Sequence, residues 1–143
     1  MRVGVLALQG DFHEHAVMLR RAGAEAPEVR LPRDLETLDG LIIPGGESTT
    51  IGKLAVAYDL IEPLRRFAAE RAIWGTCAGA IFLSQDAQRD QPLLGVMQMR
   101  VARNAFGRQV ESFETDLSVP GLPQPNGRDL PYHAVFIRAP LIE

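Results

Sequence analysis

Short apolar runs separated by longer amphipathic stretches restrict the fold of this chain more than any other feature. Residues 3–8, 41–43 and 72–74 are such runs, each too short for a buried helix and flanked by turn-forming residues. Continuous apolar runs of this length are typical of strands that are covered on both faces of a parallel sheet. The first half of the chain therefore predicts at least three parallel strands.

A helix is expected after each of these runs. Residues 12–22 carry apolar side chains at helical spacing, between a candidate N-cap at Asp11 and a stop at Gly23. Residues 61–68 repeat the helical spacing, and residues 78–83 start another helix. Because strands and helices alternate, we expect an open, mainly parallel α/β sheet with helices on both faces and right-handed crossovers.

The pattern changes after residue 96. Strand-like pieces at residues 97–101, 113–117 and 134–138 are separated by Gly, Pro and Asn. Residues 120–131 hold four prolines and two glycines, which is typical of a surface loop. We therefore expect mixed or antiparallel edge structure in this half, with a few antiparallel edge strands beside the parallel sheet.

Length, charge and cysteine content exclude several classes of protein. The 143 residues suit one domain, and 15 basic against 18 acidic residues leave a net charge of −3 without a basic stripe for nucleic acid. No apolar run approaches the roughly 20 residues of a membrane helix, so we expect no membrane partner. The one cysteine cannot form an internal disulfide, which favours a cytoplasmic location.

That one cysteine lies in an unusual setting. Residues 75–79 read Gly-Thr-Cys-Ala-Gly and directly follow an expected strand. This form matches a nucleophile elbow, in which a reactive residue occupies a tight strand-to-helix turn and glycines relieve crowding. A helix N-terminus favours the thiolate of Cys77, and the Ala78 N–H can stabilise a developing oxyanion. We predict that Cys77 is a nucleophile rather than an inert buried cysteine.

A second glycine-rich turn follows the strand at residues 41–43. Residues 44–50 read Pro-Gly-Gly-Glu-Ser-Thr-Thr, so Gly46 can aim its N–H at a ligand while Ser48 or Thr49 caps the next helix. A phosphate-binding loop fails on spacing, because five residues rather than four separate Gly46 from Gly52. Ligands of open α/β sheets bind at the carboxyl ends of strands, so both glycine turns should line one site.

Five segments together carry a specific resemblance. They are LQG at residues 8–10, PGGESTT at 44–50, GTCAG at 75–79, RN-x-FGRQ at 103–109 and FIRAP at 136–140. The set resembles the glutaminase subunit of pyridoxal 5'-phosphate synthase, a class I glutamine amidotransferase with a flavodoxin-like fold. The resemblance implies hydrolysis of L-glutamine to L-glutamate and ammonia through a cysteine thioester. It also implies a synthase subunit that uses the ammonia to build the vitamin B6 cofactor.

The resemblance also assigns site residues. The N–H groups of Gly46 and Ala78 match the oxyanion donors, and no cofactor or metal ligand is expected. Arginine suits the substrate carboxylate, because its guanidinium binds carboxylates in a bidentate manner. The positions that match the family's glutamine-binding residues are Gly46, Glu47, Ser48, Arg103, Ile137 and Arg138. Gln9 and Gly10 fit either a contact with the synthase subunit or a simple strand-ending turn.

The family's general base does not match any residue of this sequence. It belongs to a His-Pro-Glu motif after FIRAP, whereas the only histidines here are His13, His15 and His133. We expect His13 and His15 to face solvent on the first helix, and His133 to lie outside any catalytic motif. The expectation is a single glutamine amidotransferase domain over residues 1–143 that lacks its C-terminal part and the catalytic His and Glu.

Two alternatives remain open at this stage. One is a class I amidotransferase with a different ammonia acceptor, which binding to the synthase subunit would distinguish. The other is a binding or redox-sensing module of the same fold, with an exposed Cys77 but no catalytic triad. Protection of Cys77 by glutamine against an electrophile separates an enzyme from such a sensor.

Overall fold

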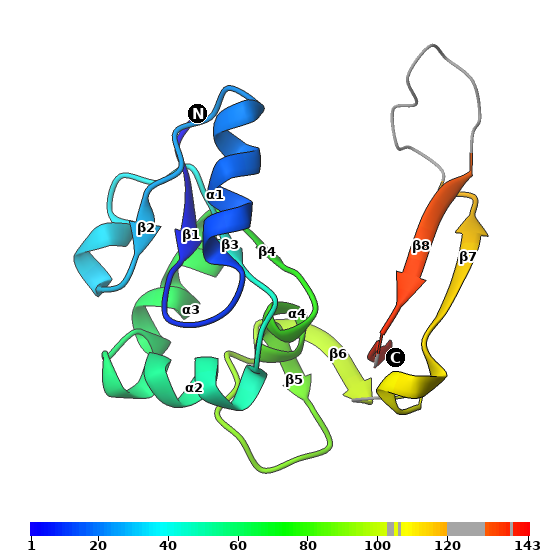
Figure 1. Cartoon of the computed structure of the whole chain (residues 1–143). Coiled ribbons are helices and arrows are strands. Elements are labelled where there is room, and N and C mark those ends of the chain that lie inside the picture. The colour runs from blue at the N-terminus through cyan, green and yellow to red at the C-terminus, as the bar shows by residue number, and fades with distance from the viewer. Residues whose placement is uncertain (103–104, 106, 120–130, 138) are drawn as a thin grey trace. The chain divides into compact units, whose positions relative to one another are not determined.

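The computed structural model describes residues 1–102, 105, 107–119, 131–137 and 139–143 (Figure 1). These divide into two compact units, Met1–Val101 with Ile142–Glu143 and Ala102–Leu141. The single domain expected over residues 1–143 stays a prediction. In chain order the elements are β1 (Val3–Leu6), α1 (Phe12–Arg21), β2 (Glu28–Val29), the 3-10 turn η1 (Pro32–Leu35), β3 (Gly40–Ile43), α2 (Ser48–Ala57), α3 (Ile61–Glu70), β4 (Ala72–Gly75), α4 (Ala78–Leu83), β5 (Ser84–Asp86), β6 (Met97–Ala102), the 3-10 turn η2 (Gln109–Glu111), β7 (Phe113–Leu117), β8 (Tyr132–Phe136) and β9 (Leu141–Ile142).

The first unit is built on a parallel four-stranded sheet in the order β2-β1-β3-β4. Its three main strands coincide with the three apolar runs of the sequence, so the predicted parallel sheet is confirmed. Ile43 pairs with Gly75 across β3 and β4, which brings the carboxyl ends of these two strands to the same edge. The two glycine-rich turns therefore leave the sheet side by side.

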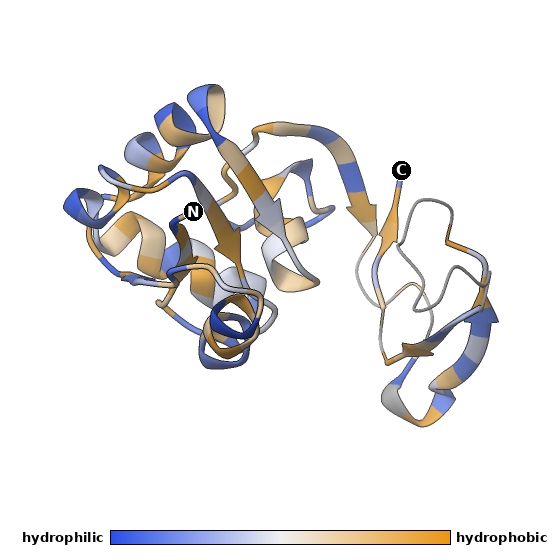
Figure 2. Cartoon of the chain, turned by 90° about the horizontal axis from the view of Figure 1, so that it is seen from above, coloured by the Kyte–Doolittle hydropathy of each residue, from blue (hydrophilic) through white to orange (hydrophobic). Residues whose placement is uncertain are grey.

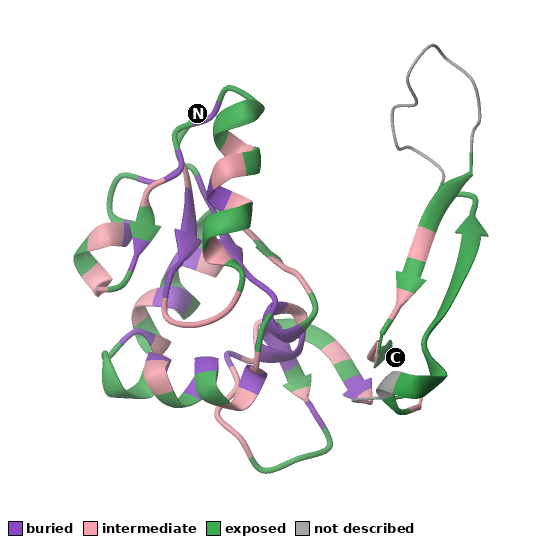
Figure 3. Cartoon of the chain, in the orientation of Figure 1, coloured by how far each residue is buried: buried purple, intermediate pink, exposed green. Residues whose placement is uncertain are grey.

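Helices cover both faces of this sheet, as predicted. On one face Val5 of β1 packs with Ala16 of α1. On the other face the next residue, Leu6, joins a larger core with Leu64 of α3 and Phe82 of α4. All four residues of β3 are buried (Figure 3). Along the helices of this unit, hydrophobic and hydrophilic segments alternate, as expected for elements with one buried side (Figure 2).

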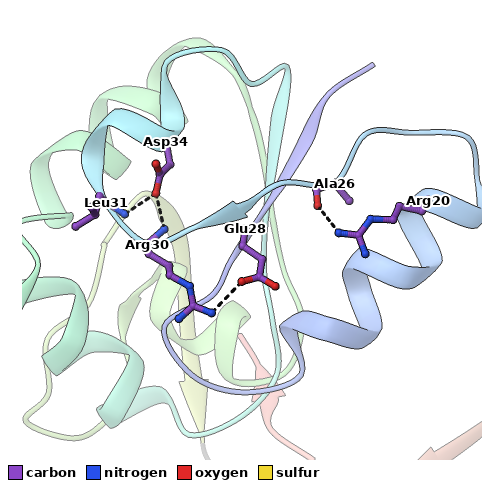
Figure 4. Close-up of polar contacts among 6 residues, drawn as sticks. All are labelled: Arg20, Ala26, Glu28, Arg30, Leu31 and Asp34. Carbon is purple, nitrogen blue, oxygen red and sulfur yellow. Dashed lines mark hydrogen bonds and ion pairs between the residues drawn. The ribbon is translucent and has the colours of Figure 1, made fainter.

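The edge formed by β2 and η1 depends on polar contacts that the sequence patterns did not predict. Arg20 at the end of α1 donates to the Ala26 carbonyl oxygen at 3.1 Å, and Arg30 pairs with Glu28 at 2.8 Å (Figure 4). One carboxylate oxygen of Asp34 accepts from the N–H groups of Arg30 and Leu31, each at 2.9 Å. These hydrogen bonds, led by that from Arg30 and opposed by partial burial, lower the pKa of Asp34.

The second half of the chain contains both parallel and antiparallel strand pairs, as expected for mixed structure. β5 pairs with β6 in parallel in a three-stranded sheet with β9. β7 and β8 form an antiparallel pair from Phe113↔Phe136 to Leu117↔Tyr132, with the two phenylalanine rings stacked at 4.8 Å. The antiparallel strands therefore exist, but in a separate two-stranded sheet rather than at the edge of the parallel one. All five residues of β7 are exposed (Figure 3).

Of the two predicted helix caps, Asp11 is confirmed in its position and the Ser48 or Thr49 cap is wrong. Asp11 occupies the N-cap position of α1, but its side chain makes no capping hydrogen bond. Neither Ser48 nor Thr49 caps α2; the N-cap is Glu47, whose carboxylate accepts from the Thr50 N–H at 2.7 Å. Ser48 is buried instead, and its hydroxyl is hydrogen-bonded to the side-chain amide of Gln91.

Candidate functional site

Cys77 occupies the turn between β4 and α4 with an exposed side chain. Its backbone has φ +48° and ψ −105°, a conformation that costs a non-glycine residue about 1–3 kcal/mol. Three main-chain hydrogen bonds hold the turn: Thr76 N–H to Ile43 O at 3.0 Å, Gly79 N–H to Thr76 O at 2.8 Å and Ile81 N–H to Cys77 O at 3.1 Å. The strained, exposed position is that of a nucleophile elbow.

The two flanking glycines are required by close packing. A β-carbon on Gly79 would overlap the carbonyl oxygen of Ile43, and one on Gly75 would overlap the main chain of Gly79. Neither glycine has a positive φ, so the need is for space rather than for a left-handed backbone. The glycines therefore let α4 approach β3 and β4 closely enough to form the tight turn at Cys77.

The turn at Gly45 and Gly46 lies directly beside this elbow. A β-carbon on Gly45 would lie 3.6 Å from the β-carbon of Cys77 and 3.4 Å from a carboxylate oxygen of Asp11. Gly46 has φ +148°, which favours glycine, and the next N–H, that of Glu47, donates to Gln9 Oε1 at 2.8 Å. The turns after β3 and β4 thus lie together, as the strand ends predicted, and the turn after β1 joins them.

Gln9 was not predicted to hold the second turn. The sequence offered it as a partner contact or a simple strand end, and the structure instead shows its side chain bridging to Glu47. Its neighbour Gly10, with φ +96°, packs so closely that a β-carbon would overlap the Gly45 carbonyl oxygen. The position of Gln9 directly after an apolar strand was the available signal, since the ends of neighbouring parallel strands converge.

The two expected oxyanion donors are the main-chain N–H groups of Gly46 and Ala78. Among the described residues, neither the Gly46 N–H nor the Ala78 N–H donates a hydrogen bond. Gly46 is exposed whereas Ala78 is buried at the first turn of α4. Two main-chain donors, one in the Gly45–Gly46 turn and one at the start of α4, are therefore without a partner among the described residues, as the donors of an oxyanion hole must be.

Glu47 and Ser48 adjoin this turn but use their side chains structurally. The Glu47 carboxylate also accepts from the Thr50 hydroxyl at 2.9 Å. Partial burial alone would raise the pKa of Glu47, but hydrogen bonds from the main chain and hydroxyls of Thr50 and Thr49 lower it to about 2. Glu47 is therefore an anion at neutral pH, whereas the Ser48 hydroxyl contacts Gln91.

The other three predicted binding residues are Arg103, Ile137 and Arg138. Arg103 and Arg138 lie outside the described residues. Ile137 belongs to the second unit and is 55% exposed. Their roles in binding stay predictions.

The histidines divide into three environments. His13 is exposed on α1, as expected. The prediction for His15 is wrong, because it is half-buried and its Nε2 lies 3.0 Å from the Thr76 hydroxyl. Its ring also meets that of Trp74 edge-on, with centroids 6.2 Å apart. His133 lies on the β7–β8 hairpin between Asp116 and Glu114.

In the described ranges, no three His, Cys, Asp or Glu side chains are arranged to hold a metal ion. No helix in that part of the chain is long and apolar enough to cross a membrane. A surface hollow of about 410 Å³ lies between η1 and α3, lined by residues such as Arg33, Glu36 and Phe67, and includes none of the predicted site residues.

Comparisons with known proteins agree with this geometry. Residues 5–143 match the model of the SNO glutamine amidotransferase family. A relative from Roseiflexus sp. (strain RS-1), named pyridoxal 5'-phosphate synthase subunit PdxT, is 57% identical over all of this chain and 75% of its own length. A relative of the same name from Thermus thermophilus is 59% identical over 97% of this chain and 71% of its own length.

Solved structures show the same relationship. A crystal structure titled as a glutamine amidotransferase superposes with a TM-score of 0.83 at 54% identity, over 96% of this chain and 71% of that chain. A putative peptidase E from Listeria monocytogenes EGD-e shares only the fold, with a TM-score of 0.50 at 15% identity over 57% of this chain and 48% of its own. Family model, close relatives and fold agree, and the chain belongs to the SNO glutamine amidotransferase family.

Proposed function

We propose that this protein is a glutaminase that hydrolyses L-glutamine and supplies ammonia to a synthase subunit for the formation of pyridoxal 5'-phosphate. The observation that carries the proposal is the strained, exposed Cys77 beside the Gly45–Gly46 turn, in a member of a glutamine amidotransferase family. The names of the relatives support the synthase subunit as partner and vitamin B6 biosynthesis as the purpose. A cytoplasmic location, expected from the single cysteine, is part of the same proposal.

The chemistry follows from the elbow. The Cys77 sulfur attacks the side-chain carboxamide carbon of glutamine, and the oxygen becomes an oxyanion that accepts from the Gly46 and Ala78 N–H groups. The C–N bond then breaks, ammonia leaves after taking up a proton, and a thioester remains. Water hydrolyses the thioester to glutamate and restores the thiol. We assign the general base of these proton transfers to none of the three histidines in the sequence.

Recognition of the amino-acid end of the substrate needs both signs of charge. Glu47 is anionic at neutral pH and adjoins the Gly46 turn, so we propose that it faces the substrate ammonium. The Ser48 side chain contacts Gln91, so any contact of Ser48 with substrate would come from its main chain. Arg103, Ile137 and Arg138 complete the proposed binding set, with the arginines suited to the substrate carboxylate.

The first test measures turnover. The full-length product of the gene, mixed with the synthase subunit, should release glutamate from glutamine, and Cys77→Ser should lower this rate roughly 10³-fold or more, because the nucleophile is lost. An unchanged rate in Cys77→Ser would remove Cys77 as the nucleophile. Glutamate release without stimulation by the synthase subunit would favour an amidotransferase with a different acceptor.

A second test needs only residues 1–143. A diazoketone analogue that keeps the amino and carboxyl groups of glutamine should alkylate Cys77, and free glutamine should slow this labelling. Intact-mass spectrometry measures the rate. Equal labelling with and without glutamine would favour a redox-sensing module of the same fold, because such a module has an exposed thiol but no glutamine pocket.

A further inference from the structure

His15 connects α1 to the residue that precedes the nucleophile. Its Nε2 lies 3.0 Å from Thr76 Oγ1, although the two residues are 61 positions apart. The imidazole meets the Trp74 ring edge-on, with an interplanar angle of 78°. Trp74 and Thr76 flank Gly75, the last residue of β4. The imidazole of His15 thus contacts the strand end on both sides of the glycine that enters the elbow.

This contact matters because the elbow needs support. The backbone of Cys77 is strained, and such conformations persist only where the surroundings fix them. Main-chain hydrogen bonds fix Thr76 from β3 and from α4. Within the described part of the chain, the hydrogen bond to His15 is the one made by the Thr76 side chain. It supplies a restraint from a third element, on the opposite face of the sheet from α4.

We propose that His15 is a positioning residue for the glutaminase reaction, acting through the Thr76 hydroxyl to fix the direction of the Cys77 thiol. This inference rests on the proposed function and deepens it. His15 does not itself exchange a proton with substrate; it restricts the rotation of the peptide between residues 76 and 77. A nucleophile displaced by about 1 Å can lose roughly a hundredfold in rate, so a small loss of restraint has a measurable effect.

The test compares two alkylating reagents on the same thiol. The glutamine-like diazoketone reacts only when the bound reagent and the sulfur are aligned, whereas iodoacetamide needs only an exposed sulfur. The variants are His15→Ala, His15→Gln, Thr76→Val and the double variant His15→Ala with Thr76→Val. His13→Ala is the matched control, because His13 lies on the same helix but is exposed.

The expected result is a change in one reaction only. At saturating diazoketone, His15→Ala and Thr76→Val should each slow labelling by roughly tenfold or more, with the half-saturating concentration and the iodoacetamide rate within about twofold of wild type. The double variant should be no slower than the slower single variant, because both remove one interaction. His15→Gln should recover most of the rate, since its amide group can donate or accept in place of Nε2.

Two results would overturn the positioning role. Equal saturating rates for His15→Ala, His13→Ala and wild type would show that the contact does not orient the thiol. A matching loss with iodoacetamide, together with a lower unfolding temperature and no recovery in His15→Gln, would make His15 a residue of the fold alone. In both cases protection of the wild-type thiol by glutamine would leave the glutaminase proposal standing, whereas absence of protection would count against that proposal itself.

Discussion

At the residue scale, Glu47 caps helix α2 and also adjoins the glycine turn at Gly45 and Gly46. Its carboxylate accepts from the Thr50 N–H and hydroxyl, and its own N–H donates to Gln9. Partial burial opposes ionisation, but these hydrogen bonds to the carboxylate outweigh it and lower the pKa to about 2. The folded state therefore favours the charged form. The anion that we propose for substrate binding is also the group that fixes the start of the helix.

Glu47→Gln should lower the free energy of unfolding by about 1 kcal/mol at pH 7, because a charged cap is replaced by a neutral one. A lowered folded-state pKa contributes stability that is full above the ordinary value of 4.5 and is lost as pH falls towards 2. The gap between wild type and Glu47→Gln should therefore close over that interval. Urea unfolding at a series of pH values, followed by the fluorescence of Trp74, the only tryptophan, measures this difference in the free energy of unfolding.

Thr50→Val provides an intermediate case, because it removes the hydroxyl donor but keeps the main-chain donor. Its loss of stability should lie below that of Glu47→Ala, which removes both contacts. A gap between wild type and Glu47→Gln that stays constant from pH 7 to pH 3 would contradict the assignment of this carboxylate as a charged cap.

Local sequence predicts the elbow but not its support. The position of Cys77 between two glycines after an apolar run was enough to predict the tight turn. A β-carbon on Gly75 would overlap residues of the same turn, and one on Gly79 would overlap the neighbouring strand β3. His15 was expected to face solvent, because helical periodicity places it on the polar face. Its partner Thr76 is brought near only by the packing of α1 on the sheet, which no local pattern encodes.

At the element scale, the β7–β8 hairpin carries a cross-strand charge arrangement. His133 on β8 lies opposite Asp116 on β7, with Nδ1 at 2.9 Å from Oδ1, and its Nε2 lies 3.1 Å from Glu114 Oε2. Hydrogen bonds to Asp116 and then to Glu114 raise the pKa of His133. All three side chains are exposed, so salt should weaken the effect.

The hairpin should therefore be more ordered at mildly acidic than at alkaline pH. A raised folded-state pKa contributes stability that is full below the ordinary value of 6.5 and is lost as pH rises through the folded value. NMR titration of the His133 ring and protection factors of the β7 and β8 amides measure this. In His133→Gln, which cannot titrate, the pH dependence of the protection factors should disappear.

Helices and strands were predicted correctly where the apolar residues follow one clear periodicity along the sequence. The three main strands and the cores of α1 and α3 follow apolar patterns, and β7 coincides with residues 113–117. The two-residue strand β2 was missed because its pairing depends on the register with β1 rather than on its own sequence. β4 was predicted as a strand, but its burial was not: the apolar Trp74 is 60% exposed because β4 is at the edge of the sheet. An apolar run predicts a strand but not what covers it.

At the scale of the whole molecule, one buried cluster connects the sheet, three helices and the elbow. Phe82 on α4 is fully buried and lies in the same cluster as Ile43 of β3 and Ala78, the residue that follows Cys77. Protein interiors are close-packed, so the position of the α4 N-terminus depends on how this cluster is filled. The conformation of the turn at Cys77 therefore depends on the same packed residues that stabilise the first unit.

Phe82→Ala should lower the free energy of unfolding of the first unit by about 3–5 kcal/mol, because a buried ring is replaced by a cavity. This is a large share of the roughly 5–15 kcal/mol that typically holds a domain together, so the urea midpoint followed by Trp74 should fall clearly. Tyr58→Ala is the control, since that ring is 47% exposed and its loss should cost about 0.5 kcal/mol or less. At urea concentrations below its own unfolding transition, Phe82→Ala should also be labelled more slowly than wild type at saturating glutamine-like diazoketone, while its rate of iodoacetamide labelling stays within about twofold of wild type. An unchanged diazoketone rate would mean that the elbow is held by its main-chain hydrogen bonds without help from the core.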